Sequence, residues 1–283
     1  MKKHRIQGKK ISPSDIFHKI VFLLLSAGFL FPLYWMVCLS FKSESEASAR
    51  PFSLPSTFTL DNFKTVFERI NLGQGMINSF LYAAVVSTLV CLFSAMAAYA
   101  IFRMGKHSSS AIYRYFVMGL AVPGMCLVVP VYMILKFLGL IGTFWAVVIP
   151  CVTGNLCASV LFIGAFIKSI PYELEEAAAL DGCSPSRCFF SIMLPMLKSG
   201  ITTKFTLLFL TMWNEYSSFK IFCLGRSRQP ITLMINSFFN TKYAVHWGQV
   251  GAAILLSSAP AIIIYCICNK QLAKALTFGS ISK

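Results

Sequence analysis

Long uncharged runs constrain this chain more than any other feature of its sequence. Five runs contain no Asp, Glu, Lys or Arg, and they cover residues 20–41, 70–102, 115–135, 137–167 and 243–269. A helix needs about 20 apolar residues to cross the roughly 30 Å of hydrocarbon in a bilayer. A sixth run, 205–224, is long enough but contains Glu215 and Lys220. The sequence therefore predicts an all-α integral membrane protein with six transmembrane helices.

Composition and charge distribution favour the same class. Charged residues make up 12% of the chain and mean hydropathy is +0.70, whereas soluble proteins carry about 25% charged residues. The tail before the first run, the loops after the second and fourth spans and the C-terminal tail hold 16 of the 25 Lys and Arg residues. This bias predicts that both termini are cytoplasmic. It also accounts for the net charge of +15 without a nucleic-acid partner.

The runs divide the chain into a basic N-terminal tail at 1–16, a six-helix domain at 17–269 and a second tail at 270–283. The first run is too long for a signal peptide and no A-x-A-like site follows it, so we expect it to remain as a helix. The ten cysteines lie mostly in apolar runs, and their spacing indicates packing residues and neither a disulfide framework nor a metal site.

The second span has a face of small residues. Ser79, Ala83, Ser87, Cys91 and Ala95 recur every four positions. In lipid, such a ridge lets a neighbouring helix approach closely. An accidental run in a helix rich in small residues is the alternative.

Four of the ten acidic residues gather in the loop after the fourth span, at Glu173, Glu175, Glu176 and Asp181. The pattern predicts two short helices. Pro171 suits a first helical position, and Gly182 suits the left-handed conformation that ends a helix. Ser184, followed by Pro185, is expected to cap the second helix.

An amphipathic helix that rests on lipid headgroups usually carries Lys and Arg, because cytoplasmic leaflets are anionic. This helix is acidic, so an anionic surface would repel it. An acidic helix that projects from a membrane bundle suits a basic groove on another protein. The remaining alternative is a loop that is simply solvated.

The loop resembles a known family. Glu176-Ala177-Ala178, three residues, Gly182, nine residues and Ile192-x-Leu194-Pro195 match the EAA loop of binding-protein-dependent ABC importer permeases. The resemblance covers nearly the whole chain and is closest to the carbohydrate-importer branch, the maltose-type permease subunits. Asn78-Ser79, the AAYA stretch with Arg103, Leu138-Gly139-Leu140 and Trp213-Asn214-Glu215 also fit that pattern.

This resemblance implies a type I importer permease fold with a cytoplasmic coupling loop at about 168–200. It further implies a bacterial plasma-membrane location and alternating access. The implied partners are a second permease subunit, two cytoplasmic ABC ATPase subunits, an extracellular solute-binding protein and a sugar or related polyol. The residues implied to contact or shape the ATPase dock are Glu175, Glu176, Ala177, Ala178, Asp181, Gly182, Ile192, Leu194 and Pro195.

Glu215 requires a separate explanation, because an ionisable residue inside a span is costly and is by default a functional candidate. Thr211, Asn214, Glu215 and Ser218 form a polar stripe, and Trp213 beside it offers a stacking face for a sugar. These five residues are candidates for the substrate pathway. The alternative is a structural role in which Glu215 pairs with Lys220 or with a neighbouring helix.

The sequence carries no motif that indicates catalysis by this chain. The stretch around Gly105-Lys106-His107 fails the P-loop pattern in both spacing and final residue. We therefore expect no cofactor on this chain, with ATP and Mg²⁺ held by the partner ATPase. The rival function is an ion-coupled secondary transporter or channel that uses Glu215. A membrane-embedded enzyme ranks third.

Overall fold

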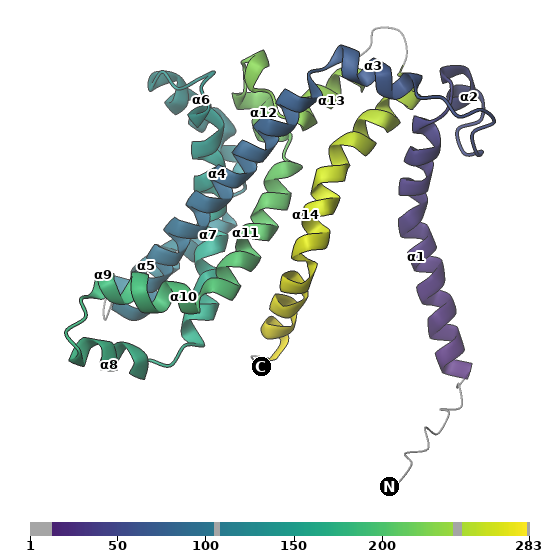
Figure 1. Ribbon diagram of the computed structural model, residues 1–283. Coiled ribbons are helices and arrows are strands. Elements are labelled where there is room, and N and C mark those ends of the chain that lie inside the picture. Colours follow the sequence, from purple (N-terminus) through teal and green to yellow (C-terminus); the bar gives the residue numbers. More distant parts are fainter. Residues whose placement is uncertain (1–12, 105–107, 240–244, 282–283) are drawn as a thin grey trace. The chain divides into compact units, whose positions relative to one another are not determined.

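The computed structural model describes residues 13–104, 108–239 and 245–281, which form helices joined by loops (Figure 1). They build two compact units. One unit contains the described residues up to Arg69 together with Phe238–Leu256, and the other contains Ile70–Ser237 together with the described residues from Ser257 onward. The helices of the first unit are α1 (Pro13–Ser40), α2 (Glu44–Ala49), α3 (Asp61–Arg69) and the first part of α14 (Trp247–Ile281).

In the first unit, small residues let α14 approach the end of α1. A Cβ at Gly251 would lie 3.1 Å from the Met36 carbonyl oxygen and 3.2 Å from the Ser40 nitrogen. One turn earlier, Gly248 lies against the side chain of Asn62, and a Cβ there would be 2.6 Å from the amide nitrogen. Larger residues at these two positions would force the helices apart.

The second unit contains the remaining helical segments. They are α4 (Leu72–Tyr99), the π-helix η1 (Ala100–Met104), α5 (Ser108–Ala121), the 3₁₀ turn η2 (Gly124–Leu127), α6 (Val128–Phe137), α7 (Trp145–Lys168), α8 (Glu173–Leu180), α9 (Pro185–Cys188), the π-helix η3 (Phe189–Met193), α10 (Leu194–Met196), α11 (Lys198–Trp213), α12 (Ser217–Phe222), the 3₁₀ turn η4 (Arg226–Arg228), most of α13 (Ile231–Phe239) and the rest of α14.

Helix α4 is the centre of this unit, and it packs along both α7 and α11 (Figure 1). The predicted ridge of small side chains is confirmed as a packing surface, since all five of its members are buried: Ser79, Ala83, Ser87, Cys91 and Ala95. Close contact between helix backbones follows from the absence of bulk on that face.

The count of six spans is not confirmed. Within the described residues, four helices are long and apolar enough to cross a membrane, at Asp15–Ser40, Leu72–Arg103, Trp145–Lys168 and Trp247–Ile267. A fifth crossing exists if Ser110–Ala121 and Gly124–Phe137 count as one span, although they are bent by 92°. The bend falls at Pro123, which lacks an N–H and has extended backbone angles.

The interrupted run at 205–224 explains the missing helix. Helix α11 has 16 residues, which at 1.5 Å per residue gives a length of about 24 Å, short of the hydrocarbon thickness. The chain leaves the helix at Asn214 and starts α12 at Ser217. Asn214 and Glu215 therefore lie in a break between two helices, whereas Thr211 lies in the last turn of α11 and Ser218 lies in α12.

The two predicted terminal tails compare differently with the structure. Most of the predicted N-terminal tail at 1–16 lies outside the described residues, and α1 begins at Pro13. Helix α14 extends to Ile281, so its backbone is helical through most of the segment predicted as the C-terminal tail, 270–283.

Candidate functional site

The acidic segment forms the short helix α8, which begins two residues after Pro171. Its first turn carries Glu173, Glu175 and Glu176, where negative charge is favoured by the helix dipole. The predicted end at Gly182 is confirmed, because this glycine has a φ of +76°. The Gly182 N–H donates to the Ala179 carbonyl at 3.0 Å, and the Cys183 N–H donates to Ala178 at 2.9 Å. These two bonds form a Schellman motif.

The second predicted helix, α9, starts as expected but is short. The Ser184 hydroxyl accepts a hydrogen bond from the Arg187 N–H at 3.4 Å, and Pro185 occupies the first helical turn. After four residues the chain changes to the π-helix η3 and then to α10, which leads into α11. The loop is thus a helical hairpin whose second arm is continuous with a long helix.

The loop shares one hydrophobic core with the ends of α4 and α7. From the loop and the start of α11 come Ala178, Cys188, Phe189, Met193 and Leu197. From α4 and η1 come Ala95, Ala98, Tyr99 and Ile101, and from α7 and its end come Val160, Ile163, Ile167 and Ile170. The hairpin is therefore packed into the bundle and is not a free projection.

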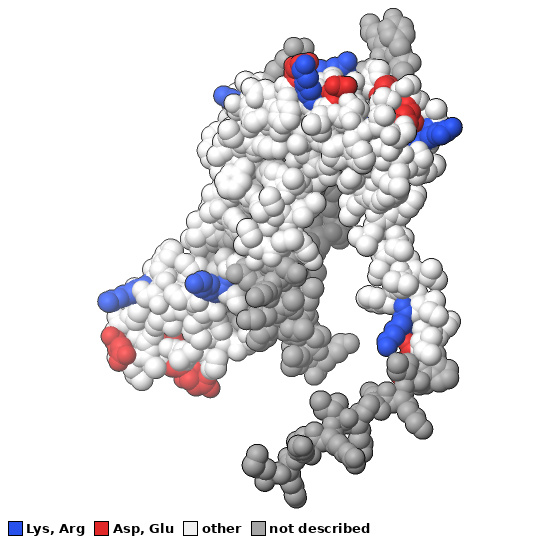
Figure 2. Space-filling view, turned by 45° about the vertical axis from the view of Figure 1, so that its right-hand side comes forward, with Lys and Arg blue, Asp and Glu red and all other residues white. Residues whose placement is uncertain are grey.

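The outer face of α8 combines carboxylates with an apolar side chain. Glu173, Glu176 and Asp181 are exposed, and Leu180 beside them is 90% exposed. Figure 2 shows the carboxylates of this segment as the red groups at the lower left of that view. An exposed leucine between acids offers another protein both an apolar anchor and a charged rim.

The predicted docking residues divide into three groups by exposure. Exposed ones are Glu176, Ala177, Asp181, Gly182 and Pro195, half-buried ones are Glu175, Ile192 and Leu194, and Ala178 is buried in the chain's own core. Leu180, which directly precedes the Asp181-Gly182 turn, was not among the predicted docking residues.

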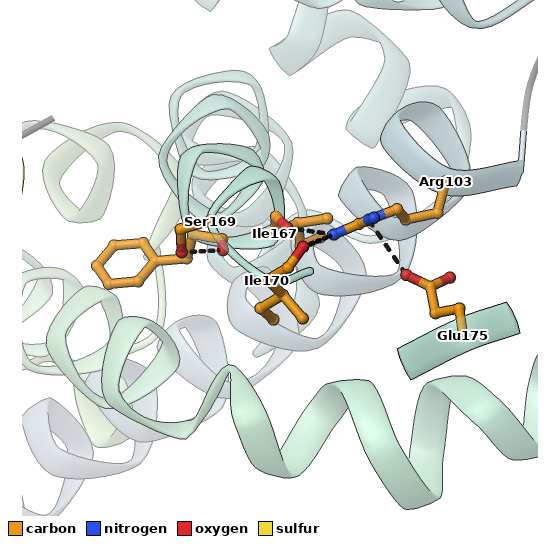
Figure 3. Close-up of polar contacts among 6 residues, drawn as sticks. Arg103, Ile167, Ser169, Ile170 and Glu175 are labelled. Carbon is orange, nitrogen blue, oxygen red and sulfur yellow. Dashed lines mark hydrogen bonds and ion pairs between the residues drawn. The ribbon is translucent and has the colours of Figure 1, made fainter. Parts of the chain in front are cut away.

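Glu175 differs from its acidic neighbours because it faces inward, toward Arg103 at the end of η1 (Figure 3). Its Oε1 lies 3.2 Å from the Arg103 Nε, and the side chains are 11% and 8% exposed, respectively. The Arg103 guanidinium also donates to the carbonyls of Ile167 and Ile170. The sequence indicated Arg103 only through its place in the AAYA pattern, and this set of contacts was not predicted.

The second group of predicted residues lies at the end of α11. Trp213 is buried, and its indole N–H donates to the Ser257 carbonyl of α14 at 3.2 Å. Its ring stacks on Phe209, with ring centroids 6.2 Å apart. In this structure Trp213 joins two helices, and its ring is not an open stacking surface.

Glu215 caps a helix. Its Oε1 accepts a hydrogen bond from the Ser218 N–H of α12 at 2.8 Å, and its carbonyl accepts one from the Thr232 hydroxyl at 2.9 Å. Lys220 lies over the Tyr216 ring at 5.3 Å. In the described part of the chain, no ion pair joins Glu215 to Lys220.

Two other members of the polar stripe, Thr211 and Asn214, are exposed, and each donates a side-chain hydrogen bond to the carbonyl four residues earlier. Ser218 is half-buried. These polar groups thus lie at or beside the break after α11, where Thr211 and Asn214 are exposed while Glu215 and Ser218 are half-buried. Among the described residues, His, Cys, Asp and Glu form no cluster of three or more that would hold a metal ion.

Comparison with known proteins gives consistent matches over most of the chain. A family model described as binding-protein-dependent transport system inner membrane component matches residues 90–277. The diacetylchitobiose uptake system permease protein NgcG of Streptomyces coelicolor is 28% identical over 259 residues, which cover 91% of this chain and 86% of that protein. The inner membrane ABC transporter permease protein YcjP of Escherichia coli is 31% identical over 264 residues, with 92% and 93% covered.

A solved structure has the same fold. It is a crystal structure of a bacterial ABC transporter involved in the import of the acidic polysaccharide alginate, and it matches with a TM-score of 0.76 at 19% identity. The match covers 93% of this chain and 99% of that one.

The apolar helices and these matches define a multi-pass membrane component of a solute transport system. The chain belongs to the family of binding-protein-dependent transport system inner membrane components. The family expected from the EAA pattern is therefore confirmed. As a permease subunit, the chain is a transport component and not an enzyme.

Proposed function

We propose that this permease subunit serves an ATP-driven importer for sugars or related polyols, and that the outer face of α8 is the dock for a partner ATPase. The observation that carries the proposal is the exposed surface of Glu173, Glu176, Leu180 and Asp181 on a hairpin that is packed into the bundle. This surface presents an apolar anchor and a charged rim to a partner. Because the hairpin shares a hydrophobic core with the ends of α4 and α7, movement of a bound partner would be transmitted to those helices.

Charge bias supports an orientation in which this dock faces the cytoplasm, where positive charge gathers in the flanking loops. Both termini then lie on the same side. ATP and Mg²⁺ are bound by the ATPase, and the permease itself supplies the path and its alternating openings. A solute-binding protein on the other side of the membrane delivers the substrate.

The substrate class follows from the relatives. The name of NgcG attributes to that protein a role in diacetylchitobiose uptake, which supports a carbohydrate here. Helix α1 adds an argument for a second permease, because the described residues of the first unit leave its apolar side chains largely uncovered, with Phe22 75% and Phe29 80% exposed. Lipid and a partner subunit are the surfaces that would cover them.

The ion-coupled alternative depends on Glu215, and the structure offers it little support. Its carboxylate is engaged in capping α12, which is a structural role. Ion coupling generally needs several ionisable groups inside the membrane.

The test is affinity purification of the tagged chain from its native host in mild detergent, with ATP hydrolysis assayed on the eluate. We expect an ATPase subunit with the wild type and its loss with Glu176→Lys. Glu68→Lys is the matched control, since Glu68 is also an exposed glutamate on a helix, and it should retain the ATPase. Equal capture by both variants would show that α8 is not the dock. A wild-type eluate without ATPase or hydrolysis would overturn the importer proposal.

The sugar assignment has a separate test. Uptake of radiolabelled mono-, di- and oligosaccharides is compared between the native host and a strain that lacks this gene. We expect loss of uptake for at least one sugar, restored by the wild-type gene and not by the Glu176→Lys variant. Unchanged uptake of every sugar and polyol tried, with an ATPase still captured, would move the substrate class away from carbohydrates.

A further inference from the structure

Arg103 connects three parts of the second unit, namely its own segment after α4, the end of α7 and the start of α8. It stands at the end of α4, in the π-helix η1, and its side chain is 8% exposed. One terminal nitrogen donates to the carbonyls of Ile167, at 2.7 Å, and of Ile170. These carbonyls lie at and just beyond the C-terminus of α7, where last-turn oxygens lack their i+4 donors. The Ile167 carbonyl also accepts the Ile170 N–H at 3.1 Å, so the guanidinium adds a further donor there and a donor at Ile170. It also places positive charge where the helix dipole favours it.

The Nε of the same guanidinium faces α8. Its Nε lies 3.2 Å from Glu175 Oε1, and the Tyr172 ring centroid lies 5.5 Å from the guanidinium carbon. Within the part of the chain that the structure describes, Oε1 forms this ion pair and no hydrogen bond. The pair is thus held by charge in a nearly dry setting, where such attraction is strong. Figure 3 shows Arg103 between the end of α7 and α8.

Phe102, the residue before Arg103, also packs against α7. The Phe102 ring covers Gly164 of α7 so closely that any Cβ at 164 would overlap it. The Lys168 ammonium lies 4.6 Å from the Phe102 centroid and 5.7 Å from that of Tyr113 on α5. Both cations at this end of α7 are therefore held by neighbours. Phe102 and Arg103 both lie in the π-helix η1, and π-helical turns often occur at functional positions.

We propose that Arg103 is the positioning residue that fixes α8 to the ends of α4 and α7, so that movement at α8 is delivered to both membrane helices together. The proposal rests on the proposed function of α8 as the ATPase dock. It also assigns separate roles to adjacent glutamates, because Glu176 faces outward to a partner while Glu175 faces inward to Arg103. Lysine cannot replace this arginine fully, since a single ammonium lacks the planar fork that reaches both carbonyls and the carboxylate.

The first experiment measures amide hydrogen exchange in peptides covering α8, using the full chain purified in lipid nanodiscs. We expect Arg103→Gln to raise exchange in α8 by about tenfold, a factor that corresponds to about 1.4 kcal/mol. Glu175→Gln, which keeps the side-chain shape, should raise it by a smaller factor. The double variant should bring exchange part of the way back toward the wild type, because no carboxylate is then left nearly buried without its cation. Arg114→Gln is the control, since Arg114 is exposed and bonds within its own helix, and it should change nothing in α8.

The second experiment tests transmission in the complex captured with its ATPase. ATP, Mg²⁺ and vanadate are added, and exchange is followed at the ends of α4 and α7. In the wild type we expect nucleotide to change exchange in both ends and in α8. In Arg103→Gln the change should be confined to α8, with the ATPase still bound, because Glu176 and Leu180 are intact.

The outcomes separate the two proposals. Unchanged α8 exchange in Arg103→Gln, or an equal nucleotide effect on α4 and α7 in variant and wild type, overturns the inference while the ATPase dock stands. Absence of an ATPase from the wild-type eluate overturns the proposed function, and the role in transmission falls with it. Increased α8 exchange together with a confined nucleotide effect supports both.

Discussion

Two buried cations organise two different regions of this molecule, and they do so in different ways. Arg103 contacts carbonyls 64 and 67 residues away in sequence and a carboxylate on α8. Lys42, which is fully buried, donates to the carbonyls of Arg50 and Pro51 and to the Ser53 hydroxyl, all within 11 residues. In the described residues, no carboxylate lies within ion-pair distance of Lys42.

The difference teaches what each cation is suited to do. A lysine that satisfies carbonyls of its own loop fixes a local fold, and Asn62 completes this arrangement by donating to the carbonyls of Ser40 and Lys42. An arginine that bridges distant elements makes them move together. Arg103 also has a carboxylate partner, Glu175. Removal of either side chain therefore leaves the other charge nearly buried without a partner, which destabilises the fold.

The largest loss of stability is expected when the contacts of Arg103 with α7 and α8 are removed. Arg103→Gln should destabilise the second unit by about 3 kcal/mol, because it leaves the Glu175 carboxylate nearly buried without its cation. Thermal unfolding in detergent, followed by loss of the monodisperse peak, measures this. The double variant Arg103→Gln, Glu175→Gln should recover part of the loss. No recovery would mean that the carbonyl contacts alone account for the effect.

Removal of the local contacts of Lys42 should cost less stability, and its effect should be confined to a smaller region. Lys42→Met removes a donor from the carbonyls of Arg50 and Pro51, although Pro51 keeps the bond from the Trp35 indole N–H. We expect a cost of about 1–3 kcal/mol, and part of that cost is offset because a buried charge is no longer present. Hydrogen exchange should rise in the loop at 41–60 and remain unchanged in α8. An equal rise in α8 would break the comparison, since it would make both cations long-range determinants.

A backbone change in the α8 hairpin tests whether its shape depends on more than Arg103. Gly182→Ala places a Cβ on a left-handed residue, which costs roughly 1–2 kcal/mol, although no atom lies within 4 Å of that position. Gly28→Ala is the control, because Gly28 sits in α1 with open space around it and a helical backbone. Unfolding temperatures should fall for the first variant and hold or rise for the second.

The smallest effect concerns the second arm of the hairpin. Ser184→Ala removes the cap of α9 and should cost about 0.5–1 kcal/mol, at the low end for such caps, because the bond to the Arg187 N–H is long at 3.4 Å. Exchange of the first amides of α9 should increase, while ATPase capture stays at the wild-type level. Loss of capture would show that the dock extends beyond the face of α8.

The sequence predicted the elements whose causes are local. Gly182 and Ser184 marked the ends of two short helices, since a left-handed glycine and a serine cap act through neighbouring residues. The small ridge of α4 was visible for a similar reason, because a spacing of four places residues on one helix face. The sixth predicted span, at 205–224, is not confirmed as one helix, because hydropathy measures composition, whereas the break at Asn214–Tyr216 depends on Glu215 capping a new helix.

The amino-acid sequence by itself determined that this is a polytopic helical membrane protein of a known importer family, with an acidic hairpin at 173–195. These properties depend on transfer free energy, helix periodicity and capping, which are set by short stretches of chain. Only the tertiary structure decided that Glu175 faces Arg103 while Glu176 faces outward, and that Trp213 is buried against α14. The physical reason is that these roles depend on which distant element occupies the space beside a side chain, and packing alone decides that.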